Sequence, residues 1–202
     1  MYKNILISWS IEFGPIAVFF IALHFLGSTD RGFIASTAIF TVLTAVALTG
    51  SYIYERRIAS FPLIAGLSVI GFGILTLVFK NPIFFIVKDT VYNGFFGVFL
   101  LGGALFGKGL LKSLFVALFD MTDKGWFILS VRWGIFFSLL AIFNEIIWHT
   151  YGRDAWVEYK FWSTIATTVF GFYQIRLSKK YRNPSASAWG MRVKPFHADE
   201  SL

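Results

Sequence analysis

Residues 126–148 read WFILSVRWGIFFSLLAIFNEIIW, an almost unbroken run of large apolar side chains. A helix rises about 1.5 Å per residue, so about 20 such residues cross a hydrocarbon core about 30 Å thick. Five further stretches of this character follow one another in the chain of 202 residues, at 11–27, 32–54, 60–79, 91–107 and 156–175. The pattern predicts an all-α, polytopic membrane protein built as a bundle of six transmembrane helices.

The composition supports this fold class. Hydrophobic residues make up 56% of the chain and charged residues only 14%, whereas soluble domains contain about 25% charged residues. The net charge of +7 would favour nucleic acid as a partner of a soluble protein. In a membrane protein, excess Lys and Arg instead sets the topology and contacts anionic headgroups. We therefore expect the lipid bilayer and its anionic phospholipids as partners, and no nucleic acid.

The first apolar stretch is the weakest. It contains Glu12, Pro15 and His24, and only Lys3 precedes it as a cation. No cleavage site follows it, so we interpret it as a retained helix. It either crosses the membrane or lies in the interface, which gives six spans, or five spans and one interfacial helix. Glu12 is a candidate structural or interaction residue.

The distribution of cations predicts the orientation. With the N-terminus inside and six spans, twelve of the 18 Lys and Arg residues lie in inside segments and five in outside segments, while Arg132 lies within a span. Cytoplasmic segments carry the excess of Lys and Arg in inner-membrane proteins. We therefore expect both termini in the cytoplasm.

Two segments are not predicted to span. Residues 108–124 carry apolar side chains at helical spacing, which fits either a short interfacial helix or an irregular cytoplasmic loop. Residues 178–202 are polar and basic without periodicity, so we expect a disordered cytoplasmic tail after a transmembrane domain of residues 1–177. Four cations near this junction are candidates for contact with lipid headgroups: Arg176, Lys179, Lys180 and Arg182.

Polar residues at the predicted outer ends of the helices form a candidate cluster. Its members are Lys80, Asn81, Lys88, Asp89, Asn144, Glu145, His149, Glu158 and Lys160. Such a cluster could brace the helices, hold a polar headgroup or line a solute path. Because the connection between the last two spans is short, we expect Glu145 and Lys160 to lie at similar depth and to form an ion pair. Lys88 or Glu158 is the alternative partner in this pair. Arg132 lies two turns inside its span, and it either snorkels to the inner interface or forms a structural ion pair.

Catalytic and metal-binding signals are weak. The chain has no cysteine and three histidines, and no zinc-protease, nucleophile-elbow or phosphate-loop motif. Asp120 and Asp123 flank a turn and fit a solvated turn or helix cap. Tryptophans lie near predicted helix ends, as in an aromatic belt: Trp126, Trp148, Trp156 and Trp162. We expect neither an enzyme nor a cofactor.

A series of motifs occurs in a fixed order along residues 5–178: EFGPIAVFF at 12–20, KNPIFFIVKDT at 80–90, NGFF at 93–96, WFILSVRW at 126–133, AIFNEIIW at 141–148 and WVEYK at 156–160. By these motifs the chain resembles the inner membrane-spanning YciB family, also called intracellular septation protein A. It departs from the family at Tyr159, where Phe is usual, and at Asp89, where Pro is common.

The resemblance implies a bacterial inner-membrane protein that contributes to cell envelope maintenance, membrane homeostasis and septation. It also implies contacts with membrane proteins of cell elongation and division, and it transfers no catalytic residue or cofactor. The family is commonly drawn with five spans. Two functions stay open: a non-enzymatic factor that binds envelope proteins or lipids, and a small transporter or channel. A transport path needs polar residues through the bilayer midplane, where the later spans offer mainly Thr, Ser and Gly.

Overall fold

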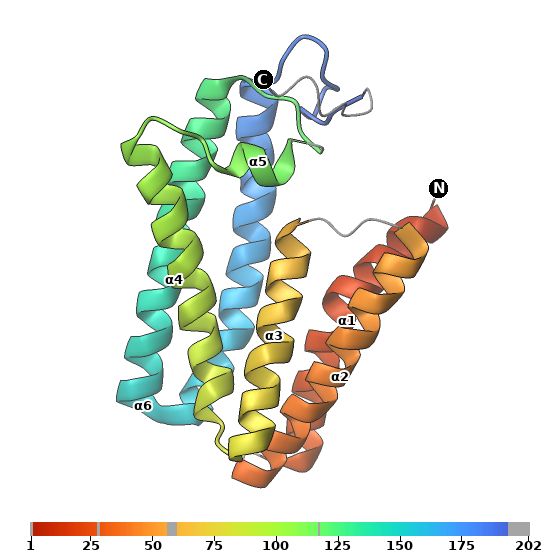
Figure 1. Cartoon of the computed structure of the whole chain (residues 1–202), viewed down its shortest axis with the longest axis vertical. Coiled ribbons are helices and arrows are strands. Elements are labelled where there is room, and N and C mark those ends of the chain that lie inside the picture. The colour runs from red at the N-terminus through yellow and green to blue at the C-terminus, as the bar shows by residue number, and fades with distance from the viewer. Residues whose placement is uncertain (1, 28, 56–59, 117, 194–202) are drawn as a thin grey trace. The chain divides into compact units, whose positions relative to one another are not determined.

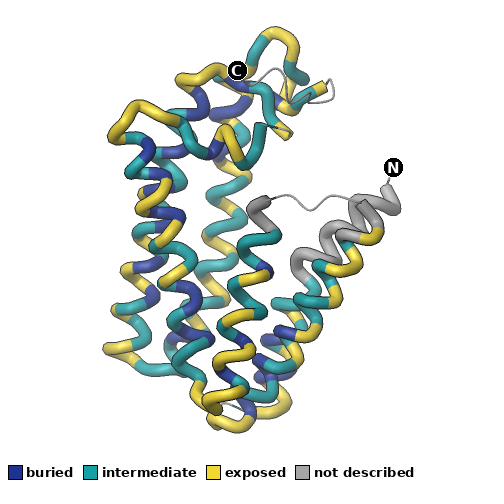
Figure 2. The backbone as a smooth tube through the Cα atoms, viewed as in Figure 1, coloured by how far each residue is buried: buried dark blue, intermediate teal, exposed yellow. Residues whose placement is uncertain are grey.

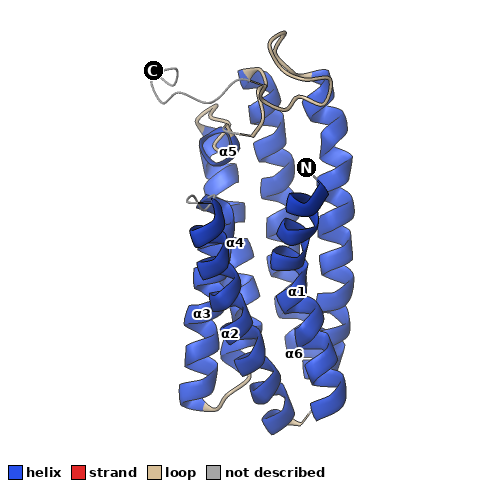
Figure 3. Ribbon diagram, turned by 90° about the vertical axis from the view of Figure 1, so that its right-hand side faces the viewer, coloured by secondary structure: helices blue, strands red, loops and turns tan. Residues whose placement is uncertain are grey.

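A computed structural model describes the backbone of residues 2–27, 29–55, 60–116 and 118–193, with side chains left out at 2–13, 52, 54–55 and 60–62. Over these residues every regular element is a helix and no strand occurs (Figure 3). The chain divides into two compact units, Met1–Tyr92 and Asn93–Leu202. Each unit is described by itself.

The first unit contains α1 (Tyr2–Leu26), α2 (Asp30–Glu55), α3 (Ser60–Phe79) and the first turns of α4 (Ile83–Leu105). Its core is aromatic, because the ring of Phe19 on α1 lies 5.9 Å from Phe33 and 5.6 Å from Phe40 on α2, and 5.3 Å from Phe85 on α4. Glycine lets α3 approach α2 closely, since a Cβ atom at Gly73 would collide with the side chain of Thr41.

The second unit contains the rest of α4, the single turn α5 (Leu111–Phe115) and α6 (Asp123–Lys180), followed by residues 181–193. Gly152 interrupts α6 with φ 80° and ψ −170°, a conformation that favours glycine. The two arms on either side of Gly152 run back along each other (Figure 1). The Phe136 and Phe170 rings stack across them with centroids 4.2 Å apart. The two arms correspond to the predicted spans 126–148 and 156–175.

Hydroxyl groups within the helices donate hydrogen bonds to their own backbone. The side chains of Thr41, Ser68 and Ser138 each donate to the carbonyl oxygen four residues earlier, at 2.8–2.9 Å, and Thr76 and Thr168 do the same. Lipid offers no partner to a hydroxyl group, so this local bond lets Ser and Thr lie within an apolar helix.

Within the described ranges, three helical segments are long and apolar enough to cross a membrane: Asp30–Ser51, Ile83–Leu105 and Asp123–Lys180. The shorter apolar helical stretches Gly14–Leu26 and Leu63–Phe79 lie in α1 and α3. Exposed residues recur along every helix, as Figure 2 shows. The prediction of an all-helical membrane protein is therefore confirmed, whereas the count of six crossings stays a prediction.

Two boundaries differ from those expected. Helix α4 begins at Ile83 and not at residue 91, because Lys88 and Asp89, which had limited the predicted span, lie within the helix as a buried pair. In the segment 108–124, residues Leu111–Phe115 form the short helix α5, and Asp123 and Lys124 already belong to α6. The other described residues of the segment are turns and loop. Leu111 on that helix is buried in the second unit and does not face lipid.

The chain after α6 also differs from the expected disordered tail of residues 178–202. Residues 178–180 still belong to α6, and residues 181–193 return along residues 116–122 through the isolated β-bridges Phe119–Met191 and Met121–Arg182. We call the segment 181–193 the tail loop. Residues 194–202 lie outside the described part of the chain.

Candidate functional site

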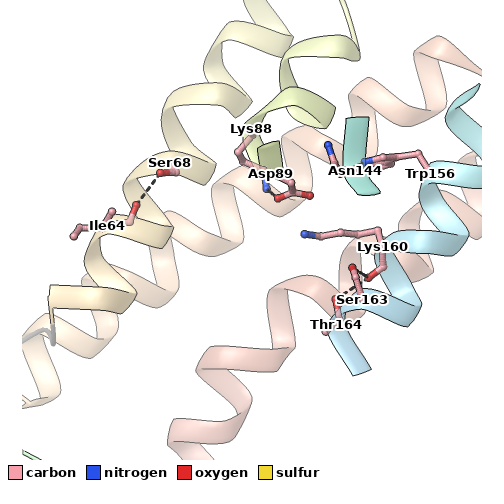
Figure 4. Close-up of polar contacts among 9 residues, drawn as sticks. All are labelled: Ile64, Ser68, Lys88, Asp89, Asn144, Trp156, Lys160, Ser163 and Thr164. Carbon is pink, nitrogen blue, oxygen red and sulfur yellow. Dashed lines mark hydrogen bonds and ion pairs between the residues drawn. The ribbon is translucent and has the colours of Figure 1, made fainter. Parts of the chain in front are cut away.

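The buried pair of the first unit lies one turn into α4. The Lys88 Nζ atom is 2.5 Å from Asp89 Oδ1, and the two side chains are only 7% and 8% exposed (Figure 4). The same ammonium group lies 4.8 Å from the centroid of the Phe85 ring. A charged side chain in lipid is costly unless it is paired, and here the carboxylate and the ring both stabilise the cation. The arrangement can brace α4.

Lys80 and Asn81 form the turn before α4. Lys80 adopts the left-handed conformation with φ 50°, and the Asn81 amide donates to the Thr76 carbonyl across the end of α3. The Asn81 side-chain oxygen then accepts a hydrogen bond from the amide of Ile83, the first residue of α4. These two residues thus shape the turn between α3 and α4, and both are exposed.

The second unit has a buried hydrogen bond between the two arms of α6. Trp156 Nε1 donates to Asn144 Oδ1 at 2.7 Å, and both residues are at most 1% exposed (Figure 4). Nearby, the Tyr159 hydroxyl donates to the Leu140 carbonyl at 2.9 Å. Burial makes these bonds expensive to break, because no water replaces the lost partner. Asn144, a candidate from the sequence, therefore closes the hairpin.

Glu145 follows Asn144 and faces a different partner. Its Oε2 atom is 3.0 Å from His149 Nε2, one turn further along the helix, and the His149 side chain is 69% exposed. Glu158 is exposed and Lys160 is half-buried, with the Lys160 carbonyl accepting hydrogen bonds from Ser163 and Thr164. The ion pair between Glu145 and Lys160 stays a prediction. So does the convergence of the whole outer cluster, because its members belong to both units.

Arg132 donates a hydrogen bond to a neutral side chain among the described residues, and its snorkelling to the inner interface or pairing with an anion stays a prediction. Its Nη1 atom donates to the side-chain oxygen of Gln174 on the other arm of α6, at 3.3 Å. Gln174 is 5% exposed, and its Nε2 atom has no hydrogen-bond partner among the described residues. The guanidinium group thus joins the two arms through a neutral amide. The side chain of Glu12, the remaining candidate, lies outside the described part of the chain, so its role stays a prediction.

The opposite end of the hairpin holds a network that the sequence did not suggest. We call this the loop end, formed by residues 105–116, 118–123 and 178–193. Asp120 accepts hydrogen bonds from the Asn183 amide at 2.6 Å and from the Ser185 hydroxyl at 2.8 Å. Arg192 lies 3.9 Å from the same carboxylate, and its Nε atom donates to the Val116 carbonyl at 2.9 Å. Asp120 therefore fixes both ends of the tail loop.

The electrostatics of Asp120 fit that role. Its partial burial alone would raise the pKa of the carboxyl group, but the hydrogen bonds from Asn183 and Ser185 and the charge of Arg192 lower the pKa below its ordinary value. The carboxylate is therefore ionised at neutral pH, where it is the stronger acceptor.

The four cations proposed for lipid contact lie beside aromatic rings or the tail loop. Arg176 lies 5.6 Å from the Tyr173 ring and Lys180 5.6 Å from the Tyr181 ring. Lys179 Nζ lies only 3.4 Å from the centroid of the Trp189 ring. Arg182 donates to the Ser187 carbonyl at 3.2 Å. All four are exposed, so they are available to a partner outside the chain.

Several residues were misjudged or missed from the sequence. Trp126 and Trp156 had been placed in an aromatic belt, but they are 1% and 0% exposed and pack inside the second unit, whereas Trp162 is 59% exposed. Gln174 and Asp120 were not recognised as contacts. Their partners lie 42 and 63 residues away in the sequence, so no local spacing could reveal them.

Comparison with known proteins decides the family. The family model described as intracellular septation protein A matches residues 7–185. The chain belongs to the intracellular septation protein A family. The names of this family and of the relatives below describe a membrane-spanning septation protein, and no enzyme.

The relatives include three proteins called inner membrane-spanning protein YciB. That of Agrobacterium fabrum is 42% identical over 81% of this chain and 85% of its own length. That of Rhizobium meliloti is 40% identical over 88% of this chain and 90% of its own length. That of Brucella melitensis is 39% identical over 87% of this chain and 94% of its own length. No solved structure matches the chain. The apolar helices fit a multi-pass inner-membrane protein like these relatives.

Proposed function

We propose that this chain is a non-enzymatic inner-membrane protein that contributes to envelope maintenance, membrane homeostasis and septation. It acts by binding membrane proteins of cell division and elongation, or lipids, within the bilayer. Membership of the septation family supports the process. The mode of action rests on one observation, that many polar side chains within the apolar helices, such as Thr41, Ser138 and Asn144, bond to the protein itself.

These internal bonds argue for binding and against transport. Ser and Thr hydroxyl groups donate to their own helices, and Asn144, Trp156 and Tyr159 bond between the arms of α6. A path for a solute needs polar groups that exchange these partners for water or for the solute. The bonds between the arms hold the α6 hairpin together, and the hydroxyl groups are engaged within their own helices. The lipid-facing side chains are left to recognise partners.

The proposed topology has six crossings with both termini in the cytoplasm. It is supported by the helical course of all six apolar stretches and by the folding back of α6 at Gly152. The excess of cations at the loop end follows the positive-inside rule. Because the chain contains no cysteine, a single introduced cysteine tests each position without background labelling.

The topology test uses two exposed positions in intact cells. Tyr151, beside Gly152, is 70% exposed, and Ser113 in α5 at the loop end is exposed too. A membrane-impermeant thiol reagent should label Tyr151→Cys from outside, and Ser113→Cys only after permeabilisation. Protection of an N-terminal tag from external protease would support six crossings, whereas its digestion would leave five.

The binding test uses photo-crosslinking in growing cells. Phe95 and Phe96 are neighbours on α4, but Phe95 is 56% exposed and Phe96 1% exposed. Benzoylphenylalanine at position 95 should yield an adduct with a division or elongation protein, and the matched variant at position 96 should yield none. Lipid adducts alone at every exposed position, together with solute flux in proteoliposomes, would contradict the proposal and favour a transporter.

A further inference from the structure

The loop end exposes large apolar side chains beyond the end of the membrane-length helices. Leu118 is 53% exposed, Trp189 55%, Met191 53% and Val193 67%. Trp189, Met191 and Val193 follow Lys179 and Lys180, the last residues of α6, and Leu118 precedes Asp123, its first residue. All four therefore lie outside the apolar span. Apolar side chains gathered in this way mark an interaction surface.

The backbone brings these four residues together, and we call them the loop-end patch. The bridge between Phe119 and Met191 and the bond from the Arg192 amide to the Leu118 carbonyl place residues 118–119 beside 191–192. Successive residues of an extended segment face opposite sides. Accordingly Met191 and Val193 are exposed, whereas Arg192 between them turns inward to Asp120 and the Val116 carbonyl.

The fold holds the tail loop so that the patch stays outward. The carbonyl of Trp189 accepts a hydrogen bond from the Ser178 hydroxyl at 2.9 Å. The next residue, Gly190, has φ 78° and is buried, and a Cβ atom there would meet the Ser178 backbone at 2.7 Å. Asp120 fixes the segments before and after this turn. The exposure of Trp189 and Met191 is therefore built into the fold.

Exposed cations adjoin the patch. Lys179 lies over the Trp189 ring, and Lys180 and Arg182 follow it. The acidic groups of the loop end are already engaged, Asp120 by the tail loop and Asp123 by Lys112 at 2.8 Å. A surface with apolar side chains at its centre and cations beside them complements an anionic lipid leaflet, where the cations meet phosphates and the apolar groups enter the acyl boundary.

We propose that the loop-end patch inserts into the cytoplasmic leaflet and that Lys179, Lys180 and Arg182 bind the phosphate groups of anionic phospholipids there. This inference rests on the cytoplasmic placement of the loop end in the proposed function, and it deepens the lipid-binding part of that proposal. The tail loop, held in place by Asp120, then forms a peripheral membrane contact in addition to the membrane-spanning helices. It couples the hairpin of α6 to the lipid composition of the inner leaflet.

The test places a nitroxide on Met191→Cys in the full chain. The labelled protein is reconstituted in nanodiscs that contain phosphatidylglycerol with phosphatidylcholine, or phosphatidylcholine alone. Relative accessibility to oxygen and to a water-soluble nickel complex gives the depth of the label. In the anionic discs we expect a depth of about 5–10 Å below the phosphates, and a shallower position in neutral discs. The depth should decrease as salt rises from about 0.1 M to 1 M.

A matched variant isolates the charges. K179Q/K180Q/R182Q in the same labelled chain should give one shallow depth in both kinds of disc. A label that stays in water in the anionic discs would overturn the proposal, as would insertion of equal depth in both lipids or insertion only after a division protein is added. The thiol-labelling test at Ser113, which lies outside the patch, is read first, so that a wrong topology is distinguished from a wrong ligand.

Discussion

Two Lys–Asp pairs in this protein have the same chemistry and opposite surroundings. Lys88 and Asp89 lie 2.5 Å apart with side chains 7% and 8% exposed, whereas Lys112 and Asp123 lie 2.8 Å apart with side chains 51% and 87% exposed. In water, solvation and salt screening leave such a pair worth little. Away from water each unpaired charge is expensive. Burial, and not the distance between the two charged atoms, therefore decides which pair contributes to stability.

The largest effect is expected from breaking the buried pair. Lys88→Met removes the cation that is bonded to the buried Asp89 carboxylate, which should cost about 3–5 kcal/mol of unfolding free energy. Asp89→Leu should act in the same direction. The double variant K88M/D89L should lose less than the sum, because each single variant already removes the interaction between the two side chains. Unfolding in mixed detergent micelles measures the three values, and strict additivity would contradict a coupled pair.

The next effect concerns a buried bond without charge. Asn144→Ala leaves the Trp156 Nε1 group unpaired inside the second unit, so we expect a loss of about 1–3 kcal/mol. Trp156→Phe removes the Nε1 donor itself, so we expect a smaller loss of unfolding free energy from the hydrogen bond than for Asn144→Ala. The smaller Phe ring adds a separate loss of packing. The same micellar unfolding assay compares them. No change on Asn144→Ala would mean that water reaches this part of the hairpin.

A local effect is expected at Asp120. Its side chain is more exposed than those of the buried pair and less exposed than those of the exposed pair. Because the folded carboxyl group has a lowered pKa, its contribution to stability is present above the unfolded value of about 3.9 and is lost as the pH falls below it. The tail loop should therefore stay docked from pH 8 down to about pH 4 and be released in stronger acid. Nitroxide mobility at Val193→Cys follows this transition.

Substitution of Asp120 gives a matched comparison at neutral pH. Asp120→Ala should release the tail loop and raise the rate of trypsin cleavage after Arg182 and Arg192 in inside-out vesicles. Asp123→Ala, three residues away, is the matched control. Among the described residues the Asp123 carboxylate bonds to Lys112 and not to the tail loop. This variant should therefore leave the cleavage rate unchanged. Equal cleavage of both variants would show that Asp120 does not hold the loop.

The smallest effect is expected at the exposed pair. Lys112→Gln should change the unfolding free energy by less than about 1 kcal/mol, and added salt should reduce even this difference. Thermal denaturation of the detergent-solubilised protein at low and high salt provides the measurement. A loss as large as that of Lys88→Met would break the contrast between the two pairs.

The comparison also explains what could be predicted from the sequence. Apolar runs of membrane length predicted the helices, and 60–79 coincides with α3, because in lipid the backbone must bond within its own segment. Long-range polar contacts could not be predicted, since Asp120 meets Asn183 and Arg132 meets Gln174 only after the chain has folded back. Adjacent charges such as Lys88 and Asp89 were read as the end of a span, because their burial depends on tertiary packing.

Genetic complementation measures the proposed role most directly. A bacterium that lacks its own relative of this protein and shows a septation defect would express the chain at a verified level in the inner membrane. We predict that cell length and septum frequency return to those of the parent strain, and that Asp123→Ala restores them equally well. Persistence of the septation defect despite a folded, membrane-inserted chain would contradict a role in septation.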